Sequence, residues 1–186
     1  MKISQSVNEA VEIIRKGGLL AYPTEAVFGL GCDPRNLSAV QRLLGVKQRP
    51  ADKGLILLAA NLNQLNEFIP PLPEEIIERI TPYWPGPVTW LLPVDEKVSP
   101  LIRGNFRKIA VRISDHPVCM QLCQRLGHPL ISTSANITGQ VEARTPQQVQ
   151  AQLGYQIDLI LDKPLGGRAR PSEIRDAMTN KVLRPG

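Results

Sequence analysis

The sequence predicts a single α/β domain with a twisted, open, mixed sheet flanked by helices. Segments with helical periodicity alternate with short apolar segments along most of the chain, which is typical of α/β folds. Some apolar segments also follow one another directly, so the sheet is expected to contain both parallel and antiparallel pairs. A chain of 186 residues suits one domain with a continuous core, and we expect residues 1–186 to form it.

Helical spacing and helix-terminating residues predict the elements of the first half. Apolar residues recur at helical intervals over residues 6–16, where Ser6 can cap the start and Gly17 and Gly18 end the pattern. Pro73, followed by two glutamates, marks another helix start. The expected elements are, in order, helix, strand, helix, strand and helix over residues 6–16, 17–25, 37–46, 55–60 and 73–81.

The second half continues the alternation and ends in two short strands. Strands are expected from apolar or alternating runs, and helices from apolar residues on one face. The expected elements are strand, strand, helix, strand, helix and strand over residues 88–94, 108–114, 116–126, 129–134, 145–153 and 157–162. After the glycine-containing GGRARP, the segments EIRDA and KVLRP are expected to pair around Thr179 and Asn180.

The charge balance favours an anionic partner. Lys and Arg outnumber Asp and Glu by 22 to 17, which gives a net charge of +5 and a pI near 9.3. This excess indicates a nucleotide, RNA or phosphate as ligand. Aromatic residues make up only 4% of the chain, which disfavours a platform that binds single-stranded RNA by base stacking.

Membrane and secreted classes are not expected. No run approaches 18 apolar residues, and the first residues form an amphipathic pattern without an apolar signal core. Cys32, Cys119 and Cys123 are an odd number of cysteines, which argues against a disulfide framework. We therefore expect a cytoplasmic protein without a membrane partner.

No motif indicates a protein-bound metal or a covalent nucleophile. His116 and His128 each precede a proline without patterned ligand neighbours, and Cys119 with Cys123 supplies only two thiols on one helix face, so helix packing is favoured over zinc. The GxSxG nucleophile motif and the GxxxxGK[ST] phosphate loop are both absent. The chemistry is therefore expected to come from cations and hydroxyls that bind and position substrates.

The first candidate site is YPTEAVFGLGCDP, residues 22–34. A strand end brings Thr24 to the place where ligands bind in open α/β sheets. Gly29 and Gly31 resemble part of a dinucleotide fingerprint, but Pro34 stands at the third glycine position, which excludes that motif. The alternative interpretation is a turn that needs glycine for its backbone conformation.

The second candidate is KQRPADKG, residues 47–54. Pro50 cannot continue the preceding helix and keeps Arg49 extended. Lys47 and Arg49 then lie two apart on an extended segment and point to the same side, as a phosphate clamp requires. A solvated loop is the alternative, and Lys53 is interpreted as solvated surface.

Two further candidates lie on strands or directly after them. LISTSANITG, residues 130–139, crowds hydroxyls and Asn136 at a strand end, where they can bind phosphate or carboxylate oxygens. A hydrogen-bonded turn is the alternative for this segment. Arg112 lies among apolar residues in KIAVRIS and requires an anionic partner, which is either a ligand or a structural Asp or Glu.

Six motifs in register over residues 22–186 resemble the YrdC/TsaC family of threonylcarbamoyl-AMP synthases, in its short bacterial form. The motifs are PTEAVFGLG, KQRP, PGPVT, AVRIS, STSANITG and VLRPG. The resemblance implies a sheet with a concave, positively charged face. It also implies a nucleotidyltransferase that condenses L-threonine, bicarbonate and ATP, with Mg²⁺, to threonylcarbamoyl-adenylate and pyrophosphate. A partner transferase complex would then modify the adenosine beside the anticodon of tRNA, and contact with tRNA itself fits the basic face.

The resemblance also implies roles for individual residues. Those expected to contact threonine are Thr24, Arg112, which would bind the carboxylate, and Thr133. Those expected to contact ATP are Lys47, Arg49, Ser134, Asn136 and Arg184. Lys47 and Arg49 are the expected catalytic residues, because they would neutralise the leaving pyrophosphate. Thr89 matches PGPVT but could shape the turn instead, and Lys108 stands where a threonine often precedes AVR and places a cation near the nucleotide.

A non-catalytic RNA-binding protein that acts on tRNA or rRNA during maturation is the alternative that the basic composition leaves open. Such a protein would show a steep salt dependence of RNA binding and no use for threonine. The enzyme, in contrast, should be stabilised by ATP and threonine together.

Overall fold

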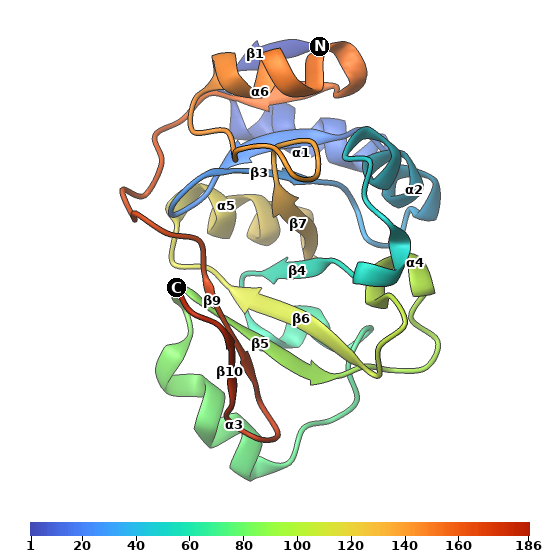
Figure 1. Cartoon of the computed structure of the whole chain (residues 1–186), viewed down its shortest axis with the longest axis vertical. Helices are drawn as coiled ribbons and strands as arrows, with labels where there is room; N and C mark the ends of the chain where they lie inside the picture. The colour runs from blue at the N-terminus through green and yellow to red at the C-terminus, as the bar shows by residue number, and fades with distance from the viewer.

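The computed structural model describes residues 1–186, which form a ten-stranded sheet (Figure 1). The strands are β1 Lys2–Ser4, β2 Leu20–Pro23, β3 Phe28–Gly31, β4 Ile56–Ala59, β5 Val88–Pro93, β6 Lys108–Ile113, β7 Leu130–Ser134, β8 Leu159–Leu161, β9 Glu173–Asp176 and β10 Val182–Arg184. Their order is β1-β8-β2-β3-β7-β4-β6-β5-β9-β10. The pairs β1–β8, β2–β8, β4–β6 and β5–β9 are parallel and the other described pairs are antiparallel, which confirms the predicted mixed sheet.

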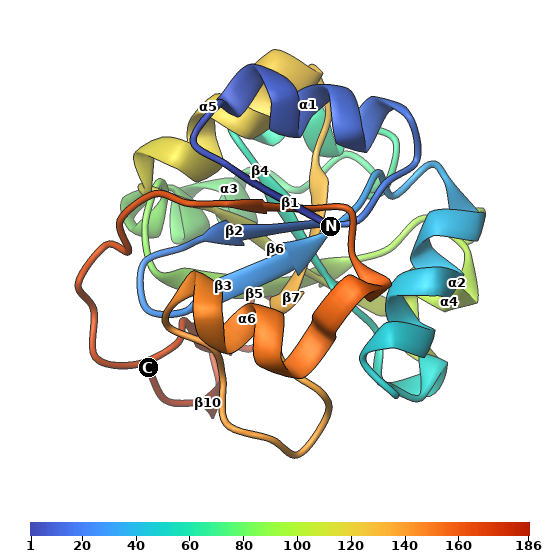
Figure 2. The same ribbon diagram turned by 90° about the horizontal axis from the view of Figure 1, so that it is seen from above.

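Helices cover both faces of this sheet (Figure 2). They are α1 Val7–Arg15, α2 Leu37–Val46, α3 Glu74–Ile80, α4 Pro100–Arg103, α5 Pro117–Leu126 and α6 Pro146–Leu153. On one face α1 and α5 pack together and bury an apolar core with Tyr22 of β2 and Leu58 of β4. Side chains of α2, α3 and α6 join the larger core, which includes Phe28 and Trp90. No helix of the structure has the length and apolar character needed to span a membrane.

Local sequence signals account for the helices that were predicted. In α1, Ser6 accepts a hydrogen bond from the backbone N–H of Glu9, and the apolar stripe is buried against the sheet. In α2, Asn36 caps the first turn in the same way by accepting from the N–H of Ala39. The observed bounds Leu37–Val46 coincide with the predicted range 37–46.

The strand β3 corrects the interpretation of the glycines in residues 22–34. Gly29 and Gly31 lie in β3, antiparallel to β2, and neither occupies a turn. A Cβ added to Gly31 would lie 2.2 Å from the backbone oxygen of Ile131, and one on Gly29 would lie 3.0 Å from the ring of Tyr22. The turn interpretation is therefore wrong, and these glycines make room for neighbouring backbone and for an aromatic ring. The sequence prediction also missed β1 and α4.

The end of α2 corrects the prediction of an extended segment at Lys47 and Arg49. Lys47 is the C-cap of α2 in helical conformation, and Gln48 has a φ of 50°. The N–H of Gln48 donates to the oxygen of Gly45 at 3.0 Å, and that of Arg49 donates to the oxygen of Leu44 at 2.9 Å. This pair of bonds is a Schellman motif, so the chain turns sharply between the two cations.

A crossing segment, residues 162–172, connects strands that are far apart in the sheet. It leaves β8, which is second in the strand order, and enters β9, which is ninth. Figure 1 shows it in orange to red, descending along one side of the molecule from the level of α6 to β9. Its passage brings residues 162–172 alongside the loop after β2.

Candidate active site

A cavity of about 680 Å³ lies among β4, β5, β6, β7, β9, the loop after β2 and the crossing segment. Lys108, Ala110 and Arg112 alternate along β6 and line it from one strand face. Two acidic residues, Glu25 and Glu142, line the cavity. Its basic lining residues are Arg49, Lys53, Arg103, Arg107, Lys108, Arg112, Arg168, Arg170 and Arg184. This excess of cations favours an anionic ligand in the cavity.

Arg112 and Glu25 form a buried ion pair in the wall of this cavity. Their Nη2 and Oε2 atoms lie 3.0 Å apart, and both side chains are at least nine-tenths buried. The other oxygen of Glu25 accepts a hydrogen bond of 2.6 Å from the hydroxyl of Ser114. The Nε of Arg112 is buried without a hydrogen-bond partner, so the guanidinium keeps donor capacity that Glu25 does not use. The structural carboxylate that the sequence analysis considered as a partner of Arg112 is therefore Glu25, and it leaves the Nε donor of Arg112 unused.

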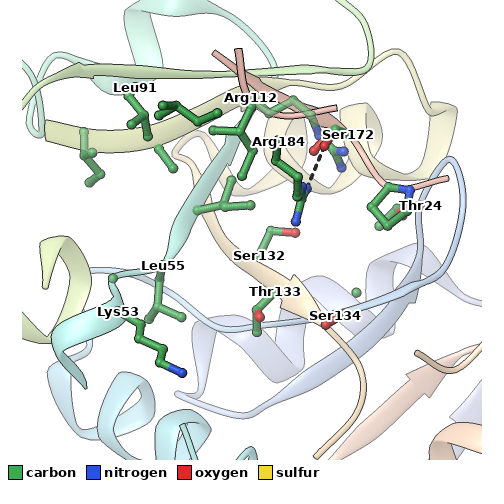
Figure 3. Close-up of a pocket in the computed structure, with 18 of the residues that line it drawn as sticks. Thr24, Lys53, Leu55, Leu91, Arg112, Ser132, Thr133, Ser134, Ser172 and Arg184 are labelled. Atoms are coloured by element: carbon green, nitrogen blue, oxygen red, sulfur yellow. Dashed lines mark hydrogen bonds between the residues drawn. The ribbon is translucent and has the colours of Figure 1, made fainter. Parts of the chain in front are cut away.

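Thr24 and Thr133 also line the cavity, from the loop after β2 and from β7 (Figure 3). The hydroxyl of Thr24 donates to the backbone oxygen of Val27 at 2.7 Å, which tightens the turn into β3. The strand β7 lies between β3 and β4 and pairs with both, which brings Ser132, Thr133 and Ser134 to the same wall of the cavity. The three consecutive hydroxyl residues of β7 thus line the same cavity as Arg112.

Lys47 is buried behind the cavity wall and is not among its lining residues. Its side chain is 2% exposed, and its Nζ donates to the backbone oxygens of Ser134 at 2.5 Å and Asn136 at 2.8 Å and to Oδ1 of Asn136 at 3.2 Å. All three ammonium protons are thereby matched with acceptors. Burial, reinforced by the charge of Arg49, lowers the pKa of Lys47 to about 8. In this structure Lys47 ties α2 to the loop after β7.

Asn136 is held in that loop as well. Its Nδ2 donates to the oxygens of Ile137 at 3.1 Å and Gln140 at 2.7 Å, while Oδ1 accepts from Lys47. Asn136 is buried and lies outside the cavity lining, whereas Ser134 lines it. The segment SAN is therefore both a hydrogen-bonded turn and part of the wall, so the two interpretations of LISTSANITG apply together.

Arg49 faces the cavity from the far side of the Schellman turn. Its Nη2 and Nε donate to the oxygen of Gly54 at 2.8 and 3.2 Å, which keeps the short loop closed. Burial lowers the pKa of Arg49, and the charge of Asp52 opposes this shift. Lys53 is exposed, as its interpretation as solvated surface requires, and it also borders the cavity. The turn after α2 directs Arg49 and Lys53 to the cavity and Lys47 behind it.

The C-terminal strands close the opposite wall. Nη2 of Arg184 donates to the backbone oxygen of Ser172 at 2.6 Å (Figure 3). Although the residue as a whole is exposed, partial burial of its guanidinium at this contact, followed by the charge of Arg112, lowers the pKa of Arg184. Thr89 is fully buried and its hydroxyl lies 2.8 Å from that of Ser172, so it supports the wall without lining it. Lys108 lines the cavity and forms an ion pair with Asp176.

Sequence reasoning missed two cations of the crossing segment, Arg168 and Arg170. Both line the cavity although they lie in a stretch with no periodicity and no recognisable motif. Their place depends on the long connection from β8 to β9, which only the strand order reveals. No cluster of three or more His, Cys, Asp or Glu side chains that could hold a metal is present in the structure.

The sheet and its basic cavity define an α/β protein whose cavity, at the ends of neighbouring strands, has a lining suited to an anionic ligand. A family profile described as "Telomere recombination" matches residues 12–186. The chain belongs to this Sua5/YciO/YrdC family.

Two relatives are similar over nearly the whole chain. A protein of Vibrio vulnificus named "Threonylcarbamoyl-AMP synthase" is 50% identical over 183 residues, which are 97% of this chain and 98% of that protein. A protein of Pseudomonas aeruginosa with the same name is 49% identical over 176 residues, or 95% of each chain.

Two solved structures share the fold. P. abyssi Sua5, crystallised with L-threonine, aligns over all of this chain with a TM-score of 0.90 and 32% identity, and the chain spans 56% of the length of that protein. E. coli YciO aligns over all of this chain and 93% of its own, with a TM-score of 0.83 and 27% identity. The α/β architecture expected from the sequence is thus confirmed by proteins of known structure.

Proposed function

We propose that the chain is a threonylcarbamoyl-AMP synthase, a nucleotidyltransferase that condenses L-threonine, bicarbonate and ATP to threonylcarbamoyl-adenylate and pyrophosphate. One observation carries the proposal: Thr24, Arg49, Arg112, Thr133 and Arg184 line a single basic cavity in a chain that is half identical to proteins of that name. The named relatives support the synthase and do not support the non-catalytic RNA-binding protein.

Threonine binds at the Arg112 end of the cavity. The guanidinium of Arg112 is held by Glu25 and keeps a buried Nε without a partner, which suits a second carboxylate. The hydroxyls of Thr24 and Thr133 contact the polar groups of the amino acid. A complex of P. abyssi Sua5 with L-threonine, a protein of the same fold, supports threonine as the ligand.

The triphosphate of ATP binds toward Arg49, Ser134 and Arg184. Arg49 and Arg184 offset the phosphate charge directly, each charge-assisted contact contributing about 1.5 to 3 kcal/mol. Lys47 and Asn136 act with them at the SAN loop, where Lys47 exchanges one of its three backbone or amide contacts for a phosphate oxygen. Thr89 and Lys108 support this wall through Ser172 and Asp176.

Mg²⁺ enters with the nucleotide. This ion usually keeps several waters and takes one or two carboxylates together with substrate phosphates. Glu142 lines the cavity without an ion pair, whereas Glu25 is engaged by Arg112, so the donor set fits an ion held by Glu142 and the phosphates. Bound there, Mg²⁺ would offset charge on the leaving pyrophosphate.

The reaction needs orientation and charge neutralisation without a covalent enzyme intermediate. The threonine amine takes up carbon dioxide, supplied by bicarbonate with loss of water, and gives a carbamate. A carbamate oxygen forms a bond to the α-phosphorus of ATP as the bond to pyrophosphate breaks. Alignment of two anions that repel each other in water contributes several kcal/mol, because effective molarities in such arrangements reach about 10⁵ M.

Residues 1–186 act in this proposal as one YrdC-like domain in the cytoplasm. The adenylate passes to a transferase complex that modifies the adenosine beside the anticodon of tRNA. The basic rim at Lys53 and Arg107 is where tRNA would contact the chain.

Pyrophosphate release from ATP tests the proposal. Release that requires both threonine and bicarbonate supports the synthase, and serine in place of threonine serves as the control substrate. Thermal unfolding with ATP, with threonine and with both should show the largest shift with both ligands. Release that is indifferent to threonine would contradict the proposal, and RNA binding with a steep salt dependence but no turnover would favour the RNA-binding alternative.

A further inference from the structure

His116, the residue that precedes α5, contacts the crossing segment. The residue is 5% exposed, and its Nε2 lies 3.2 Å from the backbone oxygen of Pro164. Because a carbonyl oxygen only accepts, Nε2 carries the proton and donates this bond. Nδ1 is buried without a partner, and burial lowers the pKa of His116, so the neutral ring with its proton on Nε2 fits this environment. The neutral ring has one donor, Nε2–H, and this donor binds the oxygen of Pro164 in the crossing segment.

The same stretch is bonded to the loop after β2. The N–H of Gly166 donates to the oxygen of Thr24 at 3.0 Å, and that of Arg168 donates to the oxygen of Glu25 at 2.8 Å. A Cβ on Gly166 would lie 2.9 Å from Cα of Glu25 and 3.2 Å from Cδ2 of His116. Close approach therefore requires glycine at 166, and the segment lies directly against the loop and the histidine ring.

Beyond these bonds the segment carries Arg168 and Arg170 to the cavity. Arg168 reaches Asp115 with Nη2 at 3.3 Å, and Nη2 of Arg144 donates to the oxygen of Ala169 at 2.7 Å. Both contacts are exposed and exchange easily with water. The bond from His116 is part-buried, and it is the side-chain anchor nearest the start of the segment.

We propose that His116 is a positioning residue that holds the crossing segment where Arg168 and Arg170 face the phosphates of a bound nucleotide. This inference rests on the proposed function for its choice of ligand, since ATP is the polyanion that the cavity would hold. His116 itself touches neither substrate: it acts through Pro164, Gly166 and the two arginines. Its loss therefore weakens ATP binding more than threonine binding.

A matched pair of substitutions isolates the donor. The amide nitrogen of glutamine reaches the position of Nε2, whereas that of asparagine reaches only the position of Nδ1. His116→Asn therefore removes the bond to Pro164 and His116→Gln keeps it. Loss of this part-buried hydrogen bond corresponds to a change of about fivefold. His128→Asn is the control, because His128 is also buried and followed by proline, but its ring contacts Pro129 and Asp33 and not the crossing segment.

The first readout is amide hydrogen exchange over residues 164–172, which needs no catalysis. We expect Gly166 and Arg168 to exchange about fivefold or more faster in His116→Asn and close to the wild-type rate in His116→Gln and His128→Asn. Gly166→Ala, whose new Cβ displaces the segment, should also accelerate exchange. Unchanged exchange in both His116→Asn and Gly166→Ala would overturn the anchor.

The second readout is ligand affinity. We expect the dissociation constant for ATP to rise about fivefold in His116→Asn, with the KM for threonine changed less than twofold and glutamine restoring ATP affinity. An equal effect on both substrates, or faster exchange without loss of ATP affinity, would overturn the positioning role. If the wild-type chain makes no adenylate, the proposed function fails, while exchange and ATP titration still report on His116.

Discussion

The ammonium of Lys47 lies 2.8 Å from the backbone oxygen of Asn136, which joins the end of α2 to the loop after β7. Two motifs that are 89 residues apart in the sequence thus form one buried contact. The ammonium matches three oxygens with three protons, which explains how a charged side chain that is 2% exposed is tolerated. Lys47 therefore shapes the cavity wall.

Replacing Lys47 by methionine should lower both stability and activity. The substitution leaves buried oxygens of Ser134 and Asn136 without a donor, so we expect the free energy of unfolding to fall by about 1 to 3 kcal/mol. Urea denaturation measures this change. Lys16→Met is the control, because Lys16 is exposed at the end of α1. Equal stabilities of wild type and Lys47→Met would show that these contacts contribute nothing.

The contribution of Lys47 to stability should depend on pH. Its pKa is about 8 in the folded protein and 10.5 in the reference state, so the unfolded chain binds more protons between these values. The lowered pKa is a penalty for keeping the buried ammonium charged: it is present in full below pH 8 and disappears as the pH rises to 10.5. The free energy of unfolding of wild type relative to Lys47→Met should therefore rise between pH 8 and pH 10.5. A difference that stays constant over this range would place the pKa of Lys47 at its ordinary value.

Arg112→Lys should selectively impair the use of threonine. Lysine keeps the charge but loses the planar fork that binds Glu25 and a second carboxylate together. We expect the KM for threonine to rise at least about tenfold, the value of one lost charge-assisted contact, with little change in the KM for ATP. Steady-state pyrophosphate release measures both constants. A change confined to the KM for ATP would refute the carboxylate assignment.

Arg184→Ala should impair the use of ATP in the complementary way. Arg184 is exposed at the end of the chain and its bond to Ser172 links β10 to the cavity wall, so the folded state should lose little stability. We expect the KM for ATP to rise about tenfold with the KM for threonine unchanged. The exposed Arg15 of α1, which lies outside the cavity lining, supplies the control Arg15→Ala. Unaltered ATP affinity in Arg184→Ala would remove Arg184 from the nucleotide site.

Two glycine-to-alanine changes should have opposite effects on stability. A Cβ on Gly31 would lie 2.2 Å from the oxygen of Ile131, so Gly31→Ala must displace β7 backbone and destabilise the protein. Gly45 lies in α2 with no atom within 4 Å of an added Cβ, so Gly45→Ala should stabilise it by about 0.5 to 1 kcal/mol. Thermal unfolding compares the two. Similar effects of both changes would contradict the close approach at Gly31.

Local signals in the sequence predicted most elements of the fold, because caps and periodicity act within a few residues. The range predicted for α2, 37–46, coincides with the helix, whose first turn Asn36 caps and whose apolar side chains are buried. The strand β3 escaped prediction because two of its four residues are glycines, whose role is decided by Tyr22 and β7. Propensity favours a turn there, and tertiary packing overrides it.

The candidate site was predicted in its residue types but not in its layout. The positions of Arg112 and Thr133 follow from strands that the sequence indicates, and both line the cavity. The orientation of Lys47 depends on the positive φ of Gln48, for which the sequence carries no clear signal. Arg168 and Arg170 reach the cavity only because β8 and β9 lie on opposite sides of the strand order.

Incorporation of labelled bicarbonate tests the proposed reaction most directly. The protein is incubated with ATP, Mg²⁺, threonine and ¹³C-bicarbonate, and the adenylate is analysed by mass spectrometry. We predict a threonylcarbamoyl-adenylate that carries one ¹³C atom, formed together with an equal amount of pyrophosphate, and almost none of it with Arg112→Lys at low threonine concentration. Absence of a labelled adenylate from the folded wild-type protein, or pyrophosphate formed without it, would contradict the account.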